Sequence, residues 1–190
     1  ASHMIEGFIE GLKSRRPALF NLYTSCQPEH GIGDDAGYAQ AKLAVESRAY
    51  PLFRYNPDRG VTPQECFDLD GNPALFDTWP SYELTYREGG REKAMSLPLS
   101  FADFARTEGR FRKHFRQAPP DTWHEGMLPM VEYLELDEDE REGRVPFLWT
   151  VDSKQRLSRL LADQTMVASC EERRDFWHML KAIARAEPEP

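Results

Sequence analysis

The sequence has few cysteines, no excess of basic residues and no long apolar run, and each shortage excludes a class of protein. The three cysteines, Cys26, Cys66 and Cys170, are an odd number, lie far apart and form no CxxC pair, so we predict neither a disulfide framework nor a self-contained zinc site. The net charge is −8, without the basic stripe that nucleic-acid binding requires. No apolar run approaches the length of about 20 residues that a membrane-spanning helix needs, and no signal-peptide core is present. We expect a soluble, cytoplasmic protein with no nucleic-acid or membrane partner.

The composition is that of an ordinary globular protein. Apolar residues make up 40% of the chain and charged residues 29%. The 190 residues suffice for one domain, or for one domain and part of another. We predict four parts: a cloning scar over 1–4, an α/β unit over 5–59, an extension over 60–186 and a tail over 187–190.

Residues 5–59 predict half of an α/β domain. The expected elements are an amphipathic helix over 5–15, a buried strand over 18–23, a loop over 24–35, an alanine-rich helix over 36–49 and a strand over 51–55. Asp34 or Asp35 is the expected N-cap of the second helix. Two strands joined by a crossover helix form a βαβ unit of a parallel sheet.

Residues after Gly60 predict a smaller α+β unit. The expected elements are strands over 66–69, 82–87, 92–97 and 147–151, a helix over 101–115 capped by Ser100, and a long final helix to residue 185 capped by Asp152-Ser153. Gly89-Gly90 is expected to close a hairpin, and residues 135–144 a charged, solvated loop. The predicted fold class is α/β: the end of a parallel-sheet domain, then an α+β extension with a hairpin and a long C-terminal helix.

Cys26 is the clearest candidate for chemistry. It lies in the loop that follows the first predicted strand, where open α/β sheets place their ligands. Its thiolate would serve there as a metal ligand or, with a lowered pKa, as a nucleophile. The competing interpretation is a small buried hydrophobic residue, because free cysteine is often buried.

Two other features near Cys26 allow two interpretations each. His30 four residues later suggests a Cys–His pair, for catalysis or for a metal, but no third ligand stands at a suitable spacing. Gly31 to Asp35 would suit a phosphate at a helix N-terminus, yet two aspartates repel an anion, so a helix cap is favoured. The remaining candidates are expected to be structural or exposed: Cys66, Cys170, His114, His124 and His178.

The stretch PALFNLYTSCQPEHGIGDDAGYAQAKLAVESRAYPLFRYNP resembles a known family. The resemblance lies in a P-x-L strand start at Pro17, T-x-C at Thr24 to Cys26, a glycine-containing loop, a helix, and PLFRYNP at 51–57. Together with the preceding FIEGLKSRR, it resembles the end of the thiamine-diphosphate domain of pyruvate:ferredoxin/flavodoxin oxidoreductases. The resemblance covers less than a third of the chain.

The resemblance implies a function for the longer protein and a role for one residue. Enzymes of this family decarboxylate a 2-oxoacid on thiamine diphosphate with Mg²⁺, pass electrons through [4Fe–4S] clusters to ferredoxin or flavodoxin, and form an acyl-CoA. Cys26 stands where the family has one of four cluster ligands, so it is the expected metal ligand. The other three ligands and the rest of the polypeptide would lie upstream, and the full-length protein would be a homo-oligomer.

This sequence also departs from the family. Many members read INxGxxKGM after the cysteine, where this chain has QPEHGIGDD, so contacts of that loop do not carry over. The Gly-Asp-Gly…Asn motif for magnesium and diphosphate is missing from the chain, and we assign no thiamine or magnesium ligands to it.

The main prediction is therefore a C-terminal fragment of a 2-oxoacid oxidoreductase that is inactive alone and binds no cofactor by itself. The second is a stand-alone interaction module in which the acidic surface and the phenylalanine-rich helix 101–115 dock a partner. A third, a small Cys–His hydrolase, would require an acidic group close to His30.

Overall fold

The computed structural model describes residues 2–185, so the predicted tail over 187–190 and Ala1 of the predicted scar lie outside the described residues. The elements are, in chain order, α1 (Ser2–Lys13), α2 (Gln27–His30), the 3₁₀ turn η1 (Asp34–Ala36), α3 (Gly37–Glu46), β1 (Arg54–Tyr55), α4 (Pro63–Cys66), β2 (Phe67–Asp68), β3 (Ser81–Glu88), β4 (Arg91–Pro98), α5 (Phe101–Ala105), η2 (Gly109–His114), β5 (Phe115–Ala118), η3 (Pro120–Thr122), β6 (Met127–Pro129), α6 (Met130–Leu134), η4 (Glu138–Arg141), β7 (Val145–Val151), β8 (Leu157–Ala162) and α7 (Gln164–Ala184).

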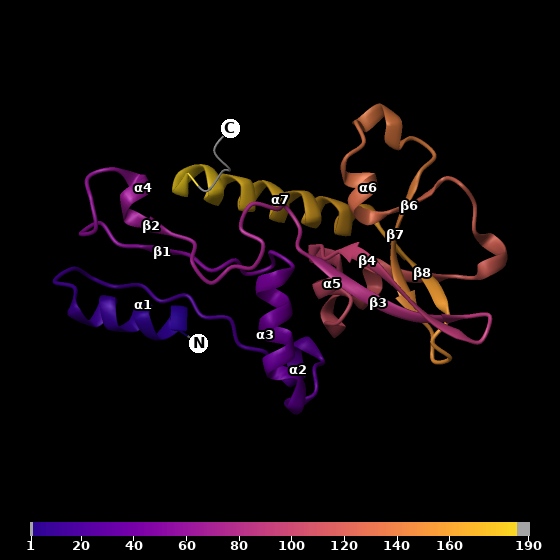
Figure 1. Cartoon of the computed structure of the whole chain (residues 1–190), viewed down its shortest axis with the longest axis horizontal. Helices are drawn as coiled ribbons and strands as arrows, with labels where there is room; N and C mark the ends of the chain where they lie inside the picture. Colours follow the sequence, from indigo (N-terminus) through magenta and orange to yellow (C-terminus); the bar gives the residue numbers. More distant parts are fainter. Residues whose placement is uncertain (1, 186–190) are drawn as a thin grey trace.

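The strands form three separate sheets. Two are antiparallel pairs, β1 with β2 and β3 with β4, and the third has the strand order β5-β8-β7-β6. In this third sheet β6 and β7 are parallel and the other pairs antiparallel. Helix α7 runs from the four-stranded sheet at one end of the molecule towards β1 and β2 at the other (Figure 1). The predicted α/β class is confirmed, as are the hairpin and the long C-terminal helix.

The main core lies between α5, α6 and α7 and one face of the four-stranded sheet. Met166, Val167 and Cys170 of helix α7 point into this core, because their spacing along the sequence places them on one face of the helix. Leu148 of β7 meets them, whereas its neighbour Phe147 points to the other face of the sheet. Both faces of β7 are therefore covered, in keeping with its continuous apolar sequence.

The start of α7 differs from the prediction. Asp152 caps no helix, because its carboxylate accepts the N–H groups of Lys154 and Arg156 and so closes the turn between β7 and β8. The helix begins after Asp163, whose carboxylate accepts the N–H of Met166 at 3.0 Å.

The helix predicted over 101–115 is also shorter than expected. Asp103 accepts the N–H and hydroxyl of Ser100, as in a capping box, so the predicted start is confirmed. The α-helix ends at Ala105, where Thr107 Oγ1 donates to the Phe104 carbonyl and Glu108 turns into the interior. A 3₁₀ turn follows.

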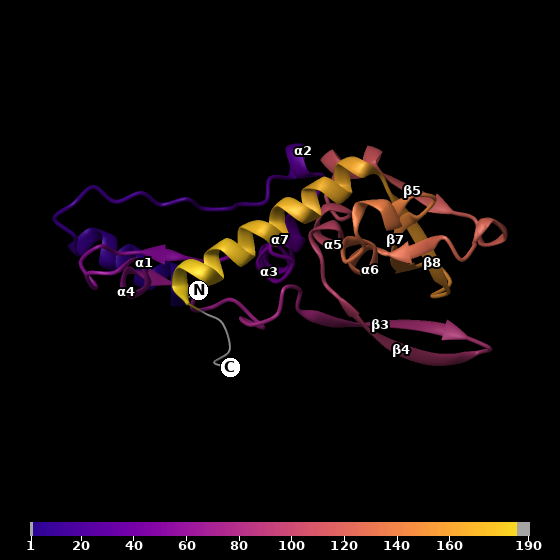
Figure 2. The ribbon, with the colours of Figure 1, turned by 90° about the horizontal axis from the view of Figure 1, so that it is seen from above.

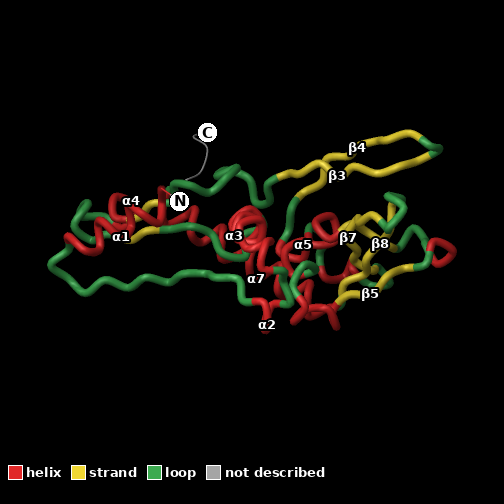
Figure 3. Tube along the Cα trace, turned by 90° about the horizontal axis from the view of Figure 1, so that it is seen from below, coloured by secondary structure: helices red, strands yellow, loops and turns green. Residues whose placement is uncertain are grey.

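The predicted hairpin is formed by β3 and β4 with Gly89-Gly90 at its tip. Both glycines have positive φ, 58° and 77°, the conformation that a two-residue hairpin turn demands. The hairpin is a sheet of its own that extends away from the other elements (Figure 3). The strand predicted over 66–69 is only the two residues of β2.

The βαβ unit predicted within 17–59 is not formed. Residues 18–23 are extended but pair with no strand among the described residues, and β1 is two residues long and antiparallel to β2. The prediction failed because an apolar run becomes a strand only when a neighbour accepts its backbone hydrogen bonds. Leu19 and Leu22 are instead 94% and 56% exposed.

Helix α1 lies beside β1 and β2 and is held mainly by ion pairs (Figure 2). Glu6 and Glu10 pair with Arg54 and Arg59 at 2.8 Å each, and both arginines also bind the buried carboxylate of Asp68. Burial would raise the pKa of Asp68, but the N–H of Asp70 and the two arginines outweigh it and lower that pKa. No residue of α1 is fully buried: Phe8 stacks on Phe20 of the next segment, and Ile5, Ile9 and Leu12 remain largely exposed.

Arg48 joins the end of α3 to α7. Its guanidinium is buried and donates to the carbonyl oxygens of the loop over 73–78, which also accepts the indole N–H of Trp177. The Arg48 Cζ atom lies 4.0 Å from the centre of the Trp177 ring. Within residues 2–185, no helix has the length and apolar character needed to cross a membrane.

Candidate functional site

Cys26 lies at the N-terminus of the four-residue helix α2, at the end of the extended segment that follows α1 (Figure 1). Its backbone is extended, with φ −126° and ψ 119°, and its side chain is exposed. Cys26 is therefore not the small buried residue of the competing interpretation. The thiol takes part in no hydrogen bond among the described residues.

His30 is the buried end of the same short helix. The backbone N–H of Cys26 reaches His30 Nδ1 at 3.3 Å, and the N–H of His30 donates to the Cys26 carbonyl at 2.8 Å. The imidazole stacks on the Tyr23 ring, with 5.9 Å between centres and 5° between planes. Cys26 and His30 are thus brought together, but the contact runs through the Cys26 backbone and not through its sulfur.

A buried carboxylate, Glu108, lies behind this loop. Its side chain has no exposed surface, and it accepts hydrogen bonds from Tyr23 Oη at 2.9 Å, Gln40 Nε2 at 3.3 Å and Arg110 Nε at 2.5 Å. His30 Nδ1 lies 3.7 Å from Glu108 Oε1. The carboxylate therefore joins the extended segment, α2 and α3 to the turn before η2. We call Tyr23, His30, Gln40, Glu108 and Arg110 the Glu108 cluster.

The electrostatics of the cluster favour a neutral phenol at Tyr23. Burial, followed by the hydrogen bond to Glu108 and the negative charge of that group, raises the pKa of Tyr23. The hydroxyl therefore remains a donor to the carboxylate throughout the physiological range of pH.

The geometry does not support a Cys–His hydrolase. Such an enzyme needs one imidazole nitrogen facing the thiol and the other held by an acidic group. Glu108 is an acidic group near His30, but it lies beside Nδ1, the same nitrogen that the Cys26 N–H reaches. No described contact joins the imidazole to the thiol.

The described residues contain no group of three or more His, Cys, Asp or Glu side chains that could hold a metal ion. Cys66 is buried at the end of α4, where its thiol donates to the Gly60 carbonyl, and Cys170 is buried on the core-facing side of α7. Burial raises the pKa of the Cys170 thiol to about 12, which leaves it unreactive. Cys26 is thus the exposed thiol of residues 2–185.

The other predicted candidates are dispersed. His114 Nδ1 lies 2.8 Å from the Asp163 carboxylate at the start of α7, and His178 Nε2 lies 2.8 Å from the Thr78 hydroxyl. His124 Nδ1 accepts the N–H of Gly126. The first two contacts join segments that are distant in the sequence and the third lies within one turn, and none of them involves Cys26.

The predicted cap by Asp34 or Asp35 is wrong. Helix α3 is entered through η1, and its N-cap position is Ala36, whose φ of −89° and ψ of −2° are already helical. A capping aspartate would need an extended backbone at that position. Gly31 ends α2 with a φ of +65° and passes close to Gly109, so its role is a tight turn and not a phosphate cradle.

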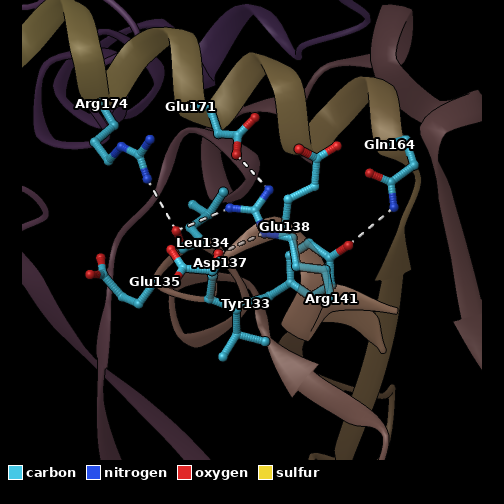
Figure 4. A pocket seen from close by; sticks show the side chains of 10 residues that line it. Tyr133, Leu134, Glu135, Asp137, Glu138, Arg141, Gln164, Glu171 and Arg174 are labelled. Carbon is cyan, nitrogen blue, oxygen red and sulfur yellow. Dashed lines mark hydrogen bonds and ion pairs between the residues drawn. The ribbon is translucent and has the colours of Figure 1, made fainter. Parts of the chain in front are cut away.

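A second polar feature lies between α6, η4 and α7, where a cavity of about 730 Å³ opens (Figure 4). Arg141 donates to Glu171 at 2.7 Å and to the Leu134 and Leu136 carbonyls, and Arg174 donates to the same Leu134 oxygen. The charged stretch over 135–144 is therefore anchored to α7 through Arg141, where the sequence suggested only a solvated loop. Both guanidinium groups are engaged in holding it.

The sequence offered no signal for the Glu108 cluster. Tyr23 and Gln40 lie 85 and 68 positions from Glu108 along the chain, so no local spacing connects them. Glu108 stood within a predicted amphipathic helix, where a glutamate is normally exposed. Burial of its carboxylate depends on tertiary contacts alone.

Comparisons with known proteins found one distant relationship. The chain is 36% identical over 69 residues to the pyruvate:ferredoxin oxidoreductase of Moorella thermoacetica (strain ATCC 39073 / JCM 9320). This match covers 36% of the chain but only 6% of the relative's length. No family model and no solved structure matches the chain. The chain is thus distantly related to an oxidoreductase of which it spans a small part.

Proposed function

We propose that this chain is the C-terminal part of a 2-oxoacid:ferredoxin or flavodoxin oxidoreductase. Residues 5–59 would form the end of its thiamine-diphosphate domain, and Cys26 would be one of four ligands of a [4Fe–4S] cluster. The identity to a pyruvate:ferredoxin oxidoreductase over 69 residues is the observation that carries this proposal. Bound thiamine diphosphate and Mg²⁺ would supply the decarboxylation chemistry and the clusters would accept the electrons.

The position of Cys26 supports its assignment as a single ligand. An iron–sulfur cluster requires thiolates that can reach it, and the Cys26 thiol is exposed at a helix N-terminus. The two other cysteines are buried elsewhere, so the remaining three ligands would come from outside this chain. We assign no thiamine or magnesium ligand to the described residues.

The exposed apolar residues of the N-terminal part support a larger assembly. Ile5, Ile9 and Leu12 on α1 are 53%, 45% and 81% exposed, and Leu19 and Leu22 follow on the unpaired segment. A strand-like segment that pairs with no strand among residues 2–185, and a helix with largely exposed Ile5, Ile9 and Leu12, fit a piece of a sheet whose other strands lie outside the chain. The occupant that we propose for this surface is the rest of the same thiamine-diphosphate domain.

The structure weighs against the alternative of a docking module built on helix 101–115. Phe104 is 1% exposed, and Phe101, Phe111 and Phe115 pack against the chain's own core. The phenylalanine face is therefore occupied within the molecule. It offers no surface for a partner.

We also propose the reaction partners, the oligomeric state and the location of the full-length enzyme. The electron acceptor would be ferredoxin or flavodoxin, the other substrates a 2-oxoacid and CoA, and the full-length enzyme a cytoplasmic homo-oligomer. The chain by itself would be inactive, since it supplies one cluster ligand and no cofactor motif.

Anaerobic reconstitution with iron and sulfide tests this proposal. The 190-residue chain is expected to form no [4Fe–4S] absorbance and to show no pyruvate-dependent dye reduction, whereas the polypeptide extended upstream is expected to show both. A full cluster on the chain alone, or an extended polypeptide that neither binds iron nor oxidises any 2-oxoacid, would contradict the proposal.

A further inference from the structure

The loop that carries Cys26 is attached to the rest of the molecule at few points. Within residues 24–31, His30 is the buried side chain, and Gly31 passes close to the backbone of Gly109. Helix α1 lies away from the loop, at the other end of the extended segment (Figure 2). The position of the loop therefore depends on what holds His30 and the adjacent backbone.

The Tyr23 ring of the Glu108 cluster holds His30. The Tyr23 ring stacks on the imidazole, and the Glu108 carboxylate lies 3.7 Å from Nδ1. Glu108 also fixes Tyr23 itself through the 2.9 Å hydrogen bond from the phenol. Loss of this carboxylate would thus release Tyr23, the residue whose ring stacks on the imidazole.

The imidazole in turn holds the backbone of Cys26. The Cys26 N–H reaches His30 Nδ1, and the first turn of α2 closes from the His30 N–H to the Cys26 carbonyl. A chain of contacts therefore runs from Glu108 through Tyr23 and His30 to Cys26. Glu108 comes from the part of the chain after Gly60, which the sequence resemblance does not cover.

We propose that Glu108 is the positioning residue for the Cys26 loop, so that the C-terminal extension sets where the Cys26 thiol is presented. The part of this inference that concerns a metal rests on the proposed function. Groups behind a ligand fix its orientation and tune the potential of the metal that it binds. Arg110 would remain when the negative charge of Glu108 is removed, so the reduction potential of a cluster bound at Cys26 would rise.

Amide hydrogen exchange in the 190-residue chain tests the positioning role. Glu108→Gln keeps the size of the side chain but removes its charge. Exchange at Cys26, His30 and Gly31 is expected to become about five-fold faster, the change that corresponds to about 1 kcal/mol, the net worth of one hydrogen bond. Glu171→Gln is the matched control, since it breaks the ion pair with Arg141 between η4 and α7 and should leave the Cys26 loop unchanged.

Each outcome of this experiment decides the question. Unchanged exchange at residues 26–31 would overturn the proposal, and so would an equal increase throughout α7, which would mean global destabilisation. If Glu108→Gln does not fold, Tyr23→Phe removes one donor to the carboxylate, keeps the stacked ring, and should loosen the same three amides.

The potential of the cluster in the upstream-extended polypeptide, measured by EPR redox titration, is the second readout. It is expected to shift upward in Glu108→Gln and to stay unchanged in Glu171→Gln; an unchanged potential in both would overturn the metal-tuning part. If Cys26→Ser leaves every cluster in place, the proposed function fails, while the exchange experiment still decides whether Glu108 positions the loop.

Discussion

Replacement of Arg48 by alanine is expected to destabilise the chain by about 3 kcal/mol and to lower its Tm by about 6–12 °C. The guanidinium donates to four carbonyl oxygens, those of Pro73, Ala74, Asp77 and Thr78, at 2.8–3.3 Å. Truncation would leave the Pro73 and Thr78 carbonyls without the guanidinium donor, leave those of Ala74 and Asp77 with one donor each, and remove the stacking on Trp177. Chemical and thermal denaturation followed by circular dichroism would measure the loss.

Two further variants separate the causes of that effect. Arg48 has a φ of +60°, which strains a residue with a side chain, so Arg48→Gly should be less destabilising than Arg48→Ala by about 1 kcal/mol. Arg112→Ala removes an exposed arginine and should change stability by less than about 0.5 kcal/mol. An Arg48→Ala variant as stable as Arg112→Ala would contradict the role that we assign to Arg48.

Replacing Leu12 and Leu19 together by aspartate is expected to have little effect on the stability of the 190-residue chain but to destabilise the upstream-extended polypeptide strongly. In the 190-residue chain these side chains are 81% and 94% exposed, so the change in stability should stay below about 0.5 kcal/mol for each. In the upstream-extended polypeptide we propose that both are buried. Each leucine would then lose about 1.5–3 kcal/mol of apolar burial, and a buried carboxylate would add a larger penalty.

Two measurements test this: thermal denaturation of the 190-residue chain, and the yield of soluble, folded protein for the extended polypeptide. Met179→Asp is the matched control, because Met179 is a half-exposed apolar residue on α7, outside the N-terminal part. It should be tolerated in both contexts. If the extended polypeptide tolerates the double aspartate variant equally well, α1 and the segment after it do not pack against the upstream part of the protein.

Sequence patterns predicted the elements whose cause is local. The hairpin followed from the two predicted strands joined by Gly89-Gly90, and in the structure Tyr82, Leu84 and Tyr86 share one half-buried face of β3. The apolar face of the final helix followed from its period, although its start was misplaced. Leu157, Leu160 and Leu161 fit a helical spacing as well as a strand that is covered on both faces, and only pairing with β5 and β7 decides between them.

The features that the sequence did not reveal depend on distant partners. Residues 18–23 have the composition of a buried strand, but no neighbouring strand lies beside them among the described residues. Glu108 is buried because Tyr23, His30 and Gln40 from the N-terminal part surround it. Cys26 was found because its residue type and its place in a loop are visible in the sequence. The cluster that holds its loop required the structure.

The most direct test of Cys26 as a cluster ligand is the iron content and EPR spectrum of the upstream-extended polypeptide that carries Cys26→Ser. Cys66→Ser and Cys170→Ser are the controls, since both of these thiols are buried away from the Cys26 loop. We expect Cys26→Ser to lose or alter one [4Fe–4S] signal and to lose pyruvate-dependent dye reduction, while the controls keep every cluster. A Cys26→Ser variant with the full iron content and an unchanged spectrum would contradict this assignment.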